Sequence, residues 1–195
     1  GQRVDATSDP FGVFGLDFTE SDVGQTFNAI TLKFDSPSDN FNPQTDLPDI
    51  HNPEGQELAR GILIYQDDGD GVFDTDSDTL LSYNPEDWVV DGDYSFVTLN
   101  FPTPPSLPTV DNGQPEFFVA LRTSNTIEFL DDFTVEIPSA GIITSMGPVH
   151  QNLNSHIITA NVPTYLQNLA NSVGALRPNS GFTPVLGIDA FDSDR

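Results

Sequence analysis

Short runs in which apolar and polar residues alternate recur along the chain, separated by segments rich in Pro, Gly, Asn and Asp. An alternation with a period of two is typical of a strand that buries one face and exposes the other. The alternating runs occupy residues 30–34, 97–101, 117–121, 133–137 and 158–162. Several short, half-buried strands with turn-rich connections predict an all-β fold, a β-sandwich of the immunoglobulin-like or jelly-roll-like kind.

Two connections between the expected strands, at residues 35–60 and 102–115, are long and contain Asp, Asn and Pro. Loops of this length are uncommon without internal structure, so we expect cations and rigid turns to order them. Only residues 164–174 have apolar positions at helical spacing, with Thr164 suited to begin a helix and Gly174 to end it. We expect one short helix there, packed on the sandwich.

The chain also repeats a short segment near its two ends. Residues 12–18 (GVFGLDF) align without gaps with residues 184–190 (PVLGIDA) at an offset of 172. A lone terminal strand cannot bury its apolar residues, whereas an open sheet edge is a template for such a strand. If such contacts run head to tail, they propagate into fibres or tubes. The residues expected to form this assembly strand are Val185, Leu186, Gly187, Ile188 and Asp189.

These patterns predict three parts in the chain. We expect a β-sandwich module at residues 1–146, and an extension with a strand and a short helix at 147–182. We expect residues 183–195 to form a terminal strand that is donated to a neighbouring copy of the chain. The main predicted partner is therefore the protein itself, in a head-to-tail polymer.

The charge of the chain restricts its partners. With 30 acidic and 6 basic residues the formal net charge is −24, so nucleic acid and anionic membranes are excluded as electrostatic partners. No apolar run is long enough for membrane insertion, and the absence of cysteine excludes disulfides and thiolate zinc sites. Asp supplies 23 of the acids, which favours metal-binding loops over helix surfaces. Adaptation to high salt would give a similar charge, and that alternative stays open.

One loop concentrates this acidity. Residues 67–78 (DDGDGVFDTDSD) contain six aspartates in twelve residues and directly follow the strand-like run at 61–65. Six carboxylates packed this closely repel one another unless a cation neutralises them, and Ca²⁺ takes six to eight oxygen ligands. The candidate ligands are Asp67, Asp68, Asp70, the Val72 carbonyl, Asp74, Asp76 and Asp78. The alternative is a solvated acidic turn between two strands.

We expect Asp68, Asp70, Asp74 and Asp78, with the Val72 carbonyl, to form the main calcium site. Acids at a strand end and in the other loops predict at least one further Ca²⁺. The candidate residues for this second site are Asp17, Asp35, Asp39, Asp46, Asp91 and Asp93.

The loop resembles the calcium loops of EF-hand-like and thrombospondin type 3 repeats over about a dozen residues. Ser77 replaces the closing Glu of the EF-hand pattern, so we do not expect a helix-loop-helix. Together with FFVALRTS at 117–124, the loop is similar to the tandem β-sandwich modules of secreted microbial surface proteins. This resemblance implies a calcium-stabilised structural domain of an extracellular surface layer, fibre or adhesin. The start Gly1-Gln2-Arg3 is typical of a processed chain, which agrees with secretion.

No catalytic motif stands out, and we do not expect an enzyme. The three histidines lack the spacing of a zinc hydrolase, and there is neither G-x-S-x-G nor a Walker loop. Two alternatives remain. One is a carbohydrate-binding or adhesive module, although a single tryptophan, Trp88, is weak support. The other is a glycoside-active enzyme that uses acid pairs such as Asp131 and Asp132 or Asp91 and Asp93.

Overall fold

In the computed structural model, β-strands account for nearly all of the regular secondary structure among the described residues. The predicted helix at 164–174 and the predicted assembly strand at 183–195 lie outside the described residues. The structure describes residues 2–5, 9–18, 24–36, 41–47, 50–51, 57–58, 61–109, 113–124, 127, 131–150, 153–155 and 157–161.

The strands form two main sheets and a two-stranded ribbon. The large sheet contains β1 (Gln2–Asp5), β3 (Phe27–Asp35), β8 (Asn84–Pro85), β9 (Val89–Asp91), β10 (Tyr94–Asn100), β12 (Asp132–Ile137), β13 (Ile142–Thr144), β14 (Gly147–Val149), β15 (Leu153–Asn154) and β16 (Ile158–Asn161). The small sheet contains β2 (Phe11–Leu16), β6 (Ile62–Gln66), β7 (Thr79–Leu80) and β11 (Phe117–Leu121). The ribbon consists of β4 (Ile50–His51) and β5 (Glu57–Leu58).

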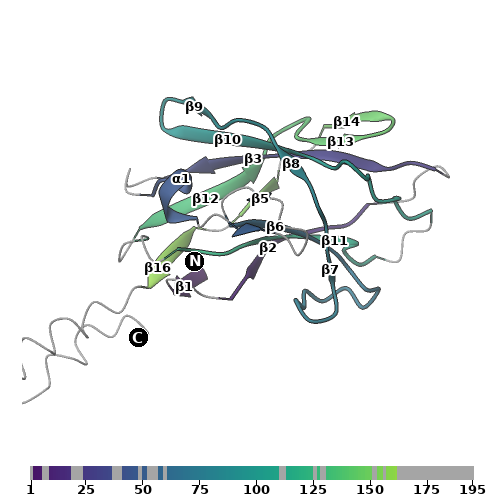
Figure 1. The fold of residues 1–195 in the computed structure, drawn as a ribbon, viewed down its shortest axis with the longest axis horizontal. Coiled ribbons are helices and arrows are strands. Elements are labelled where there is room, and N and C mark those ends of the chain that lie inside the picture. Colours follow the sequence, from purple (N-terminus) through teal and green to yellow (C-terminus); the bar gives the residue numbers. More distant parts are fainter. Residues whose placement is uncertain are drawn as a thin grey trace, which may run out of the picture.

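The order of strands is β1-β16-β12-β3-β10-β8 in the large sheet and β2-β11-β6-β7 in the small one. The central strands pair antiparallel, whereas β1 runs parallel to β16. In Figure 1, β3, β10 and β12 lie above β2, β6 and β11, so the two sheets form the layers of a sandwich. The predicted all-β sandwich is confirmed.

Aromatic rings join the two layers. Phe27 of β3 and Phe117 of β11 are fully buried, and their ring centroids lie 5.2 Å apart. Phe18 and Phe101 pack on Phe27 with centroid distances of 5.4 and 4.8 Å. Aromatic pairs at such distances contribute about 0.5–1.5 kcal/mol each beyond the area they bury. This four-ring cluster therefore holds one sheet against the other.

A second aromatic group fixes part of the long connection after β3. The rings of Phe41 and Phe133 stack with a centroid distance of 3.9 Å, and Phe34 lies beside both. Phe41 precedes the single turn of helix α1 (Pro43–Asp46), which the hydrophobic pattern did not predict. Its local signal is the Asn-Pro pair at its start, because the Asn42 side chain accepts a hydrogen bond from the Gln44 amide.

The alternation predicted half-buried strands, and β3, β10 and β12 follow that prediction. Strand β11 does not, because all five of its residues are buried. Neighbouring residues of a strand point to opposite faces, so β11 is covered on both sides. Phe117 packs into the sandwich, whereas Phe118 packs against Phe73 of the acidic loop.

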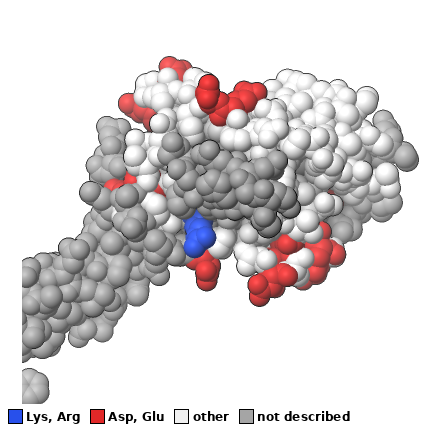
Figure 2. Space-filling view, viewed as in Figure 1, with Lys and Arg blue, Asp and Glu red and all other residues white. Residues whose placement is uncertain are grey.

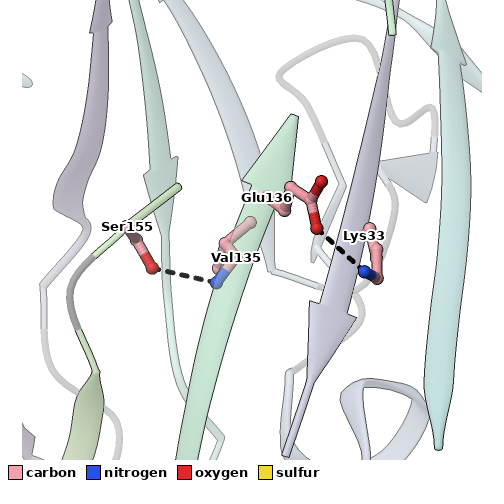
Figure 3. Close-up of polar contacts among 4 residues, drawn as sticks. All are labelled: Lys33, Val135, Glu136 and Ser155. Carbon is pink, nitrogen blue, oxygen red and sulfur yellow. Dashed lines mark hydrogen bonds and ion pairs between the residues drawn. The ribbon is translucent and has the colours of Figure 1, made fainter. Parts of the chain in front are cut away.

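Strands β14, β15 and β16, in the first part of the extension predicted at residues 147–182, continue the large sheet. Strand β14 forms a hairpin with β13, and both β15 and β16 pair with β12. Ser155 holds β12 through two bonds: its hydroxyl accepts from the Val135 amide, and its own amide donates to the Val135 carbonyl. Figure 3 shows the hydroxyl contact beside the ion pair of Lys33 and Glu136, 2.8 Å long, on the same sheet. The predicted boundary at residue 146 falls in the turn of the β13–β14 hairpin.

Lys33, the only lysine, lies on the outer face of the large sheet. Its ammonium donates to Glu136 and lies 3.9 Å from the centre of the Tyr94 ring. The hydrogen bond that Lys33 donates to Glu136 raises the pKa of Lys33, so the side chain stays charged. The lysine thus joins β3, β10 and β12 across the outer face.

Because Phe117 of β11 belongs to the four-ring cluster, truncation of its side chain should strongly destabilise the fold. Phe117→Ala should lower the free energy of unfolding by about 3–5 kcal/mol, because it removes a fully buried ring between the sheets. Urea unfolding followed by circular dichroism measures this change. The control is Val90→Ala, whose side chain is 62% exposed and whose loss should cost less than about 0.5 kcal/mol. Equal costs for the two variants would contradict the assigned core.

A candidate metal centre in the acidic loop

The acidic loop, residues 67–78, connects two paired strands of the small sheet. Strand β6 leads into it and β7 leads out, with Gln66 opposite Thr79 in an antiparallel pair. The Asp67 amide also donates to the Glu116 carbonyl, which ties the first residue of the loop to the chain just before β11. Figure 2 shows acidic side chains gathered at the lower right of the molecule, where Figure 1 places this loop. Both ends of the loop are therefore fixed by the sheet.

Short-range hydrogen bonds fold the loop back on itself. The Asp67 carboxylate accepts from the amides of Gly69 and Gly71 at 2.8 and 3.1 Å. Asp70 accepts from the Val72 amide at 2.8 Å, and Asp74 accepts from the amide two residues later at the same distance. An aspartate that bonds the backbone two residues on forms an Asx turn. The aspartates thus shape the loop as well as charge it.

Two glycines allow this course of the backbone. Gly69 and Gly71 have φ angles of 111° and 73°, in the left-handed region that other residues rarely adopt. At Gly71 a Cβ would also lie only 3.0 Å from side-chain atoms of Gln114. Gly71 is therefore required twice, by its own conformation and by the segment that leads into β11.

Asp78 holds the two halves of the loop together. It is only 7% exposed, and its two carboxylate oxygens accept from the amides of Asp68 and Asp74 at 3.3 and 2.9 Å. The Asp78 amide in turn donates to the Asp74 carbonyl. Burial of the Tyr65 ring, and secondarily the nearby Asp78 charge, raises the pKa of Tyr65. Asp78 thus joins the two halves of the loop through hydrogen bonds.

Phe73 anchors the loop to the outer face of the small sheet. Its ring lies 5.3 Å from Tyr65 of β6 and 5.6 Å from Phe118 of β11, measured between centroids. It also lies over Gly12 of β2, where a Cβ would come within 3.3 Å of the ring. The acidic loop therefore covers three adjacent strands with one aromatic side chain. This role of Phe73 was not predicted from the sequence. The signal for it was the presence of an aromatic residue inside an acidic loop.

The loop brings three carboxylates together. Asp67, Asp68 and Asp70 each offer an oxygen, and these oxygens lie within 4.8 Å of one another. Carboxylate oxygens are the ligands that hard cations such as Ca²⁺ prefer, so the donor set fits the predicted ion. Of the expected main ligands, Asp68 and Asp70 belong to this trio. Asp74 and Asp78 are instead joined to each other through the Asp74 amide.

The remaining predicted ligands in the loop lie outside the trio. Asp76 and the Val72 side chain are both exposed, and the Asp76 amide bonds Asp74. Asp67, which was not among the main predicted ligands, lies in the trio as a half-buried residue. Within the part of the chain that the structure describes, this is the one group of three such side chains with converging ligand atoms.

The residues predicted for a second metal site are spread over the molecule. Asp17 follows β2 and is exposed, and Asp35 ends β3. Asp91 and Asp93 flank the β9–β10 turn and are exposed, whereas Asp39 lies outside the described residues. Asp46 is buried, and its carboxylate accepts from the Asn42 amide at 2.6 Å and from the Thr45 hydroxyl. Asp46 thus has a local structural role in α1.

Comparisons with known proteins found no relative of this chain. No family model matches the chain, and neither a curated protein sequence nor a solved structure is significantly similar to it. None of the helices among the described residues has the length and apolar character needed to span a membrane.

Phe73 should stabilise the whole fold as well as the acidic loop. Phe73→Ala should lower the free energy of unfolding by about 2–3 kcal/mol, somewhat less than a fully buried ring would, because it uncovers Tyr65 and Phe118. Its matched control is the neighbouring Val72→Ala, since Val72 is 62% exposed. Chemical denaturation of both variants measures the difference. A cost for Phe73→Ala no larger than for Val72→Ala would contradict the anchoring role.

Removing the Asp78 carboxylate should loosen the acidic loop, because it removes hydrogen bonds within the loop. Asp78→Ala leaves the amides of Asp68 and Asp74 without their carboxylate partner, which should cost about 1–3 kcal/mol. Amide hydrogen exchange should become faster at both positions, whereas the central strand β11 should keep its protection. Unchanged exchange at Asp68 and Asp74 would show that Asp78 does not hold these amides.

Proposed function

We propose that this chain is a calcium-stabilised structural subunit of an extracellular assembly, such as a filament, a tube or a surface layer. The observation that carries the proposal is the way the acidic loop is built into the sandwich. The carboxylates of Asp67, Asp68 and Asp70 converge in the same loop as Phe73, which lies on the small sheet. A cation held there stabilises the loop, and through Phe73 it stabilises the fold.

The charge of the chain supports the same function. At a net charge of −24, self-repulsion destabilises the compact state, and bound cations relieve it. Within the described part of the chain, the trio is the one group of three carboxylates whose oxygens converge, so Ca²⁺ binding there relieves the repulsion among them. A protein stabilised in this way keeps its structure where calcium is plentiful, as it is outside the cell.

The sequence repeat supports assembly. The terminal segment at 184–190 resembles residues 12–18, most of which form β2. A chain that carries a second copy of one of its own strands can place that copy in another subunit. Because such a contact is head to tail, it leaves an acceptor and a donor free at the two ends and propagates.

The two alternative functions have less support. Trp88, the sole tryptophan, packs against Phe34 with a centroid distance of 5.7 Å, so it does not stand free as a platform for sugar rings. The acid pair Asp91 and Asp93 lies exposed at a hairpin turn. A glycoside-active enzyme needs its carboxylates on either side of a bound sugar, which this position does not favour.

Calcium should raise the melting temperature of the protein. Binding to the folded state alone stabilises by about 2.7 kcal/mol when free Ca²⁺ exceeds its Kd a hundredfold. For a domain of this size that corresponds to a shift of roughly 5–10 °C. Thermal unfolding in Ca²⁺ and in excess chelator measures the shift. An identical melting curve in the two conditions would overturn the proposed calcium stabilisation.

The ligands can be tested with variants of equal charge. The double change Asp68→Asn and Asp70→Asn should remove most of the calcium-dependent shift, because it removes two of the three converging carboxylates. The double change Asp91→Asn and Asp93→Asn alters the net charge equally at exposed positions on β9–β10, and should leave the shift intact. Equal loss of the shift in both double variants would indicate general charge screening instead of a site.

A further inference from the structure

We propose that the groove along β11 that holds β2 is the acceptor slot for residues 183–189 of a second copy of the chain. This inference rests on the assembly part of the proposed function, and it names the site at which one subunit receives the next. The incoming segment takes the place of β2 and pairs antiparallel with β11.

The strongest support is a close approach at Gly15. A Cβ at this position would lie 2.7 Å from Cγ and 3.1 Å from Cβ of Pro115, with Phe118 on its other side at 3.4 Å. Pro115 belongs to the rigid approach to β11, so any residue other than glycine has to move it. The terminal segment has Gly187 at the matching position. The repeat therefore preserves the one residue type that the slot sterically requires.

The inward positions of the slot are matched as well. Leu16 is 3% exposed and lies opposite Phe117, and its counterpart in the terminal segment is Ile188. Phe14 lies opposite Val119, and its counterpart is Leu186. Apolar side chains thus remain on the inner face when one segment replaces the other. Since a shift by one residue would turn them outward, the alignment also fixes the register.

The match ends where the pairing of β2 is irregular. The register of β2 on β11 shifts between Phe14 and Gly12, and Pro184 stands at the position of Gly12. Proline lacks the amide needed to continue a ladder, but it is tolerated at the first residue of a strand. The exchanged strand therefore begins near Pro184 and pairs regularly from Leu186 to Asp189.

Strand β2 is suited to give up its place. Only Leu16 of its six residues is buried, whereas all five residues of β11 are. Along the described residues β2 pairs with β11 alone, because it is the edge strand of its sheet. An edge strand with few buried side chains and an interrupted ladder opens at a low free-energy cost. Exchange of like strands then replaces equivalent contacts.

The chain is long enough to make this contact between subunits. Residues 162–182, 21 in number, separate the end of β16 from the donor segment. At full extension they span at most about 70 Å. The donor can thus reach a second copy while β16 keeps its place in the large sheet.

Cross-linking can test the slot in the full chain, because the 195-residue sequence contains no cysteine. Continuing the register of Phe117 and Leu16 places Asp17, and hence Asp189 of the donor, opposite Glu116. One full-length variant carries Glu116→Cys and a mass-distinct one carries Asp189→Cys. After mixing and mild oxidation, mass spectrometry should find a disulfide between the two different chains. As a control, Ser193→Cys in place of Asp189→Cys should cross-link at least tenfold less.

The steric requirement supplies a second test. Adding Gly187→Val to the Asp189→Cys chain should reduce the cross-link at least tenfold, because the new side chain meets Pro115. Pro115→Gly in the acceptor chain should restore part of it. A cross-link that is absent, that forms only within one chain when both cysteines are present, or that is insensitive to Gly187→Val would overturn the proposed slot.

The same samples separate this inference from the calcium proposal. A calcium-dependent melting shift without the intermolecular cross-link overturns the slot alone. A cross-link that forms equally in chelator, together with an unchanged melting curve, supports the slot and overturns calcium stabilisation alone.

Discussion

The burial of β11 on both faces is the constraint on which the rest of the structure depends. Its inward side chains, with Phe117 at the centre, join the two sheets. Its outward side chains need a separate cover, since a sandwich leaves the outer face of each sheet to solvent. The acidic loop provides this cover at Phe118 through Phe73. A strand central to the fold therefore depends on a loop that carries six aspartates.

This dependence explains why the loop combines two apparently conflicting properties. Charge repulsion favours an open loop, whereas the contact of Phe73 with the sheet needs a closed one. Asx turns and the buried Asp78 close it with hydrogen bonds from within. The converging carboxylates of Asp67, Asp68 and Asp70 keep their mutual repulsion despite these hydrogen bonds. A bound cation would relieve this repulsion, which links a metal site to stability instead of to a reaction.

The small sheet also links the loop to the proposed assembly. Phe73 lies over Gly12 of β2, and Pro115 and Gln114 lie next to Gly15 and Gly71. The acceptor slot and the acidic loop therefore share the segment that leads into β11. A change in the closure of the loop would alter the wall of the slot. The proposed metal site and the proposed acceptor slot thus lie on one sheet.

The sequence by itself determined what is local. Alternation over a few residues predicted β3, β10 and β12, because side chains alternate along any strand, and Asp-Gly spacing predicted the tight turns of the loop. Tertiary structure decided what depends on distant residues. It buried the outer face of β11 under Phe73, and it turned Asp78 toward backbone amides while Asp67 joined the trio. It also placed β14, β15 and β16 in the large sheet. Such outcomes depend on which strands pair, and no local pattern contains that information.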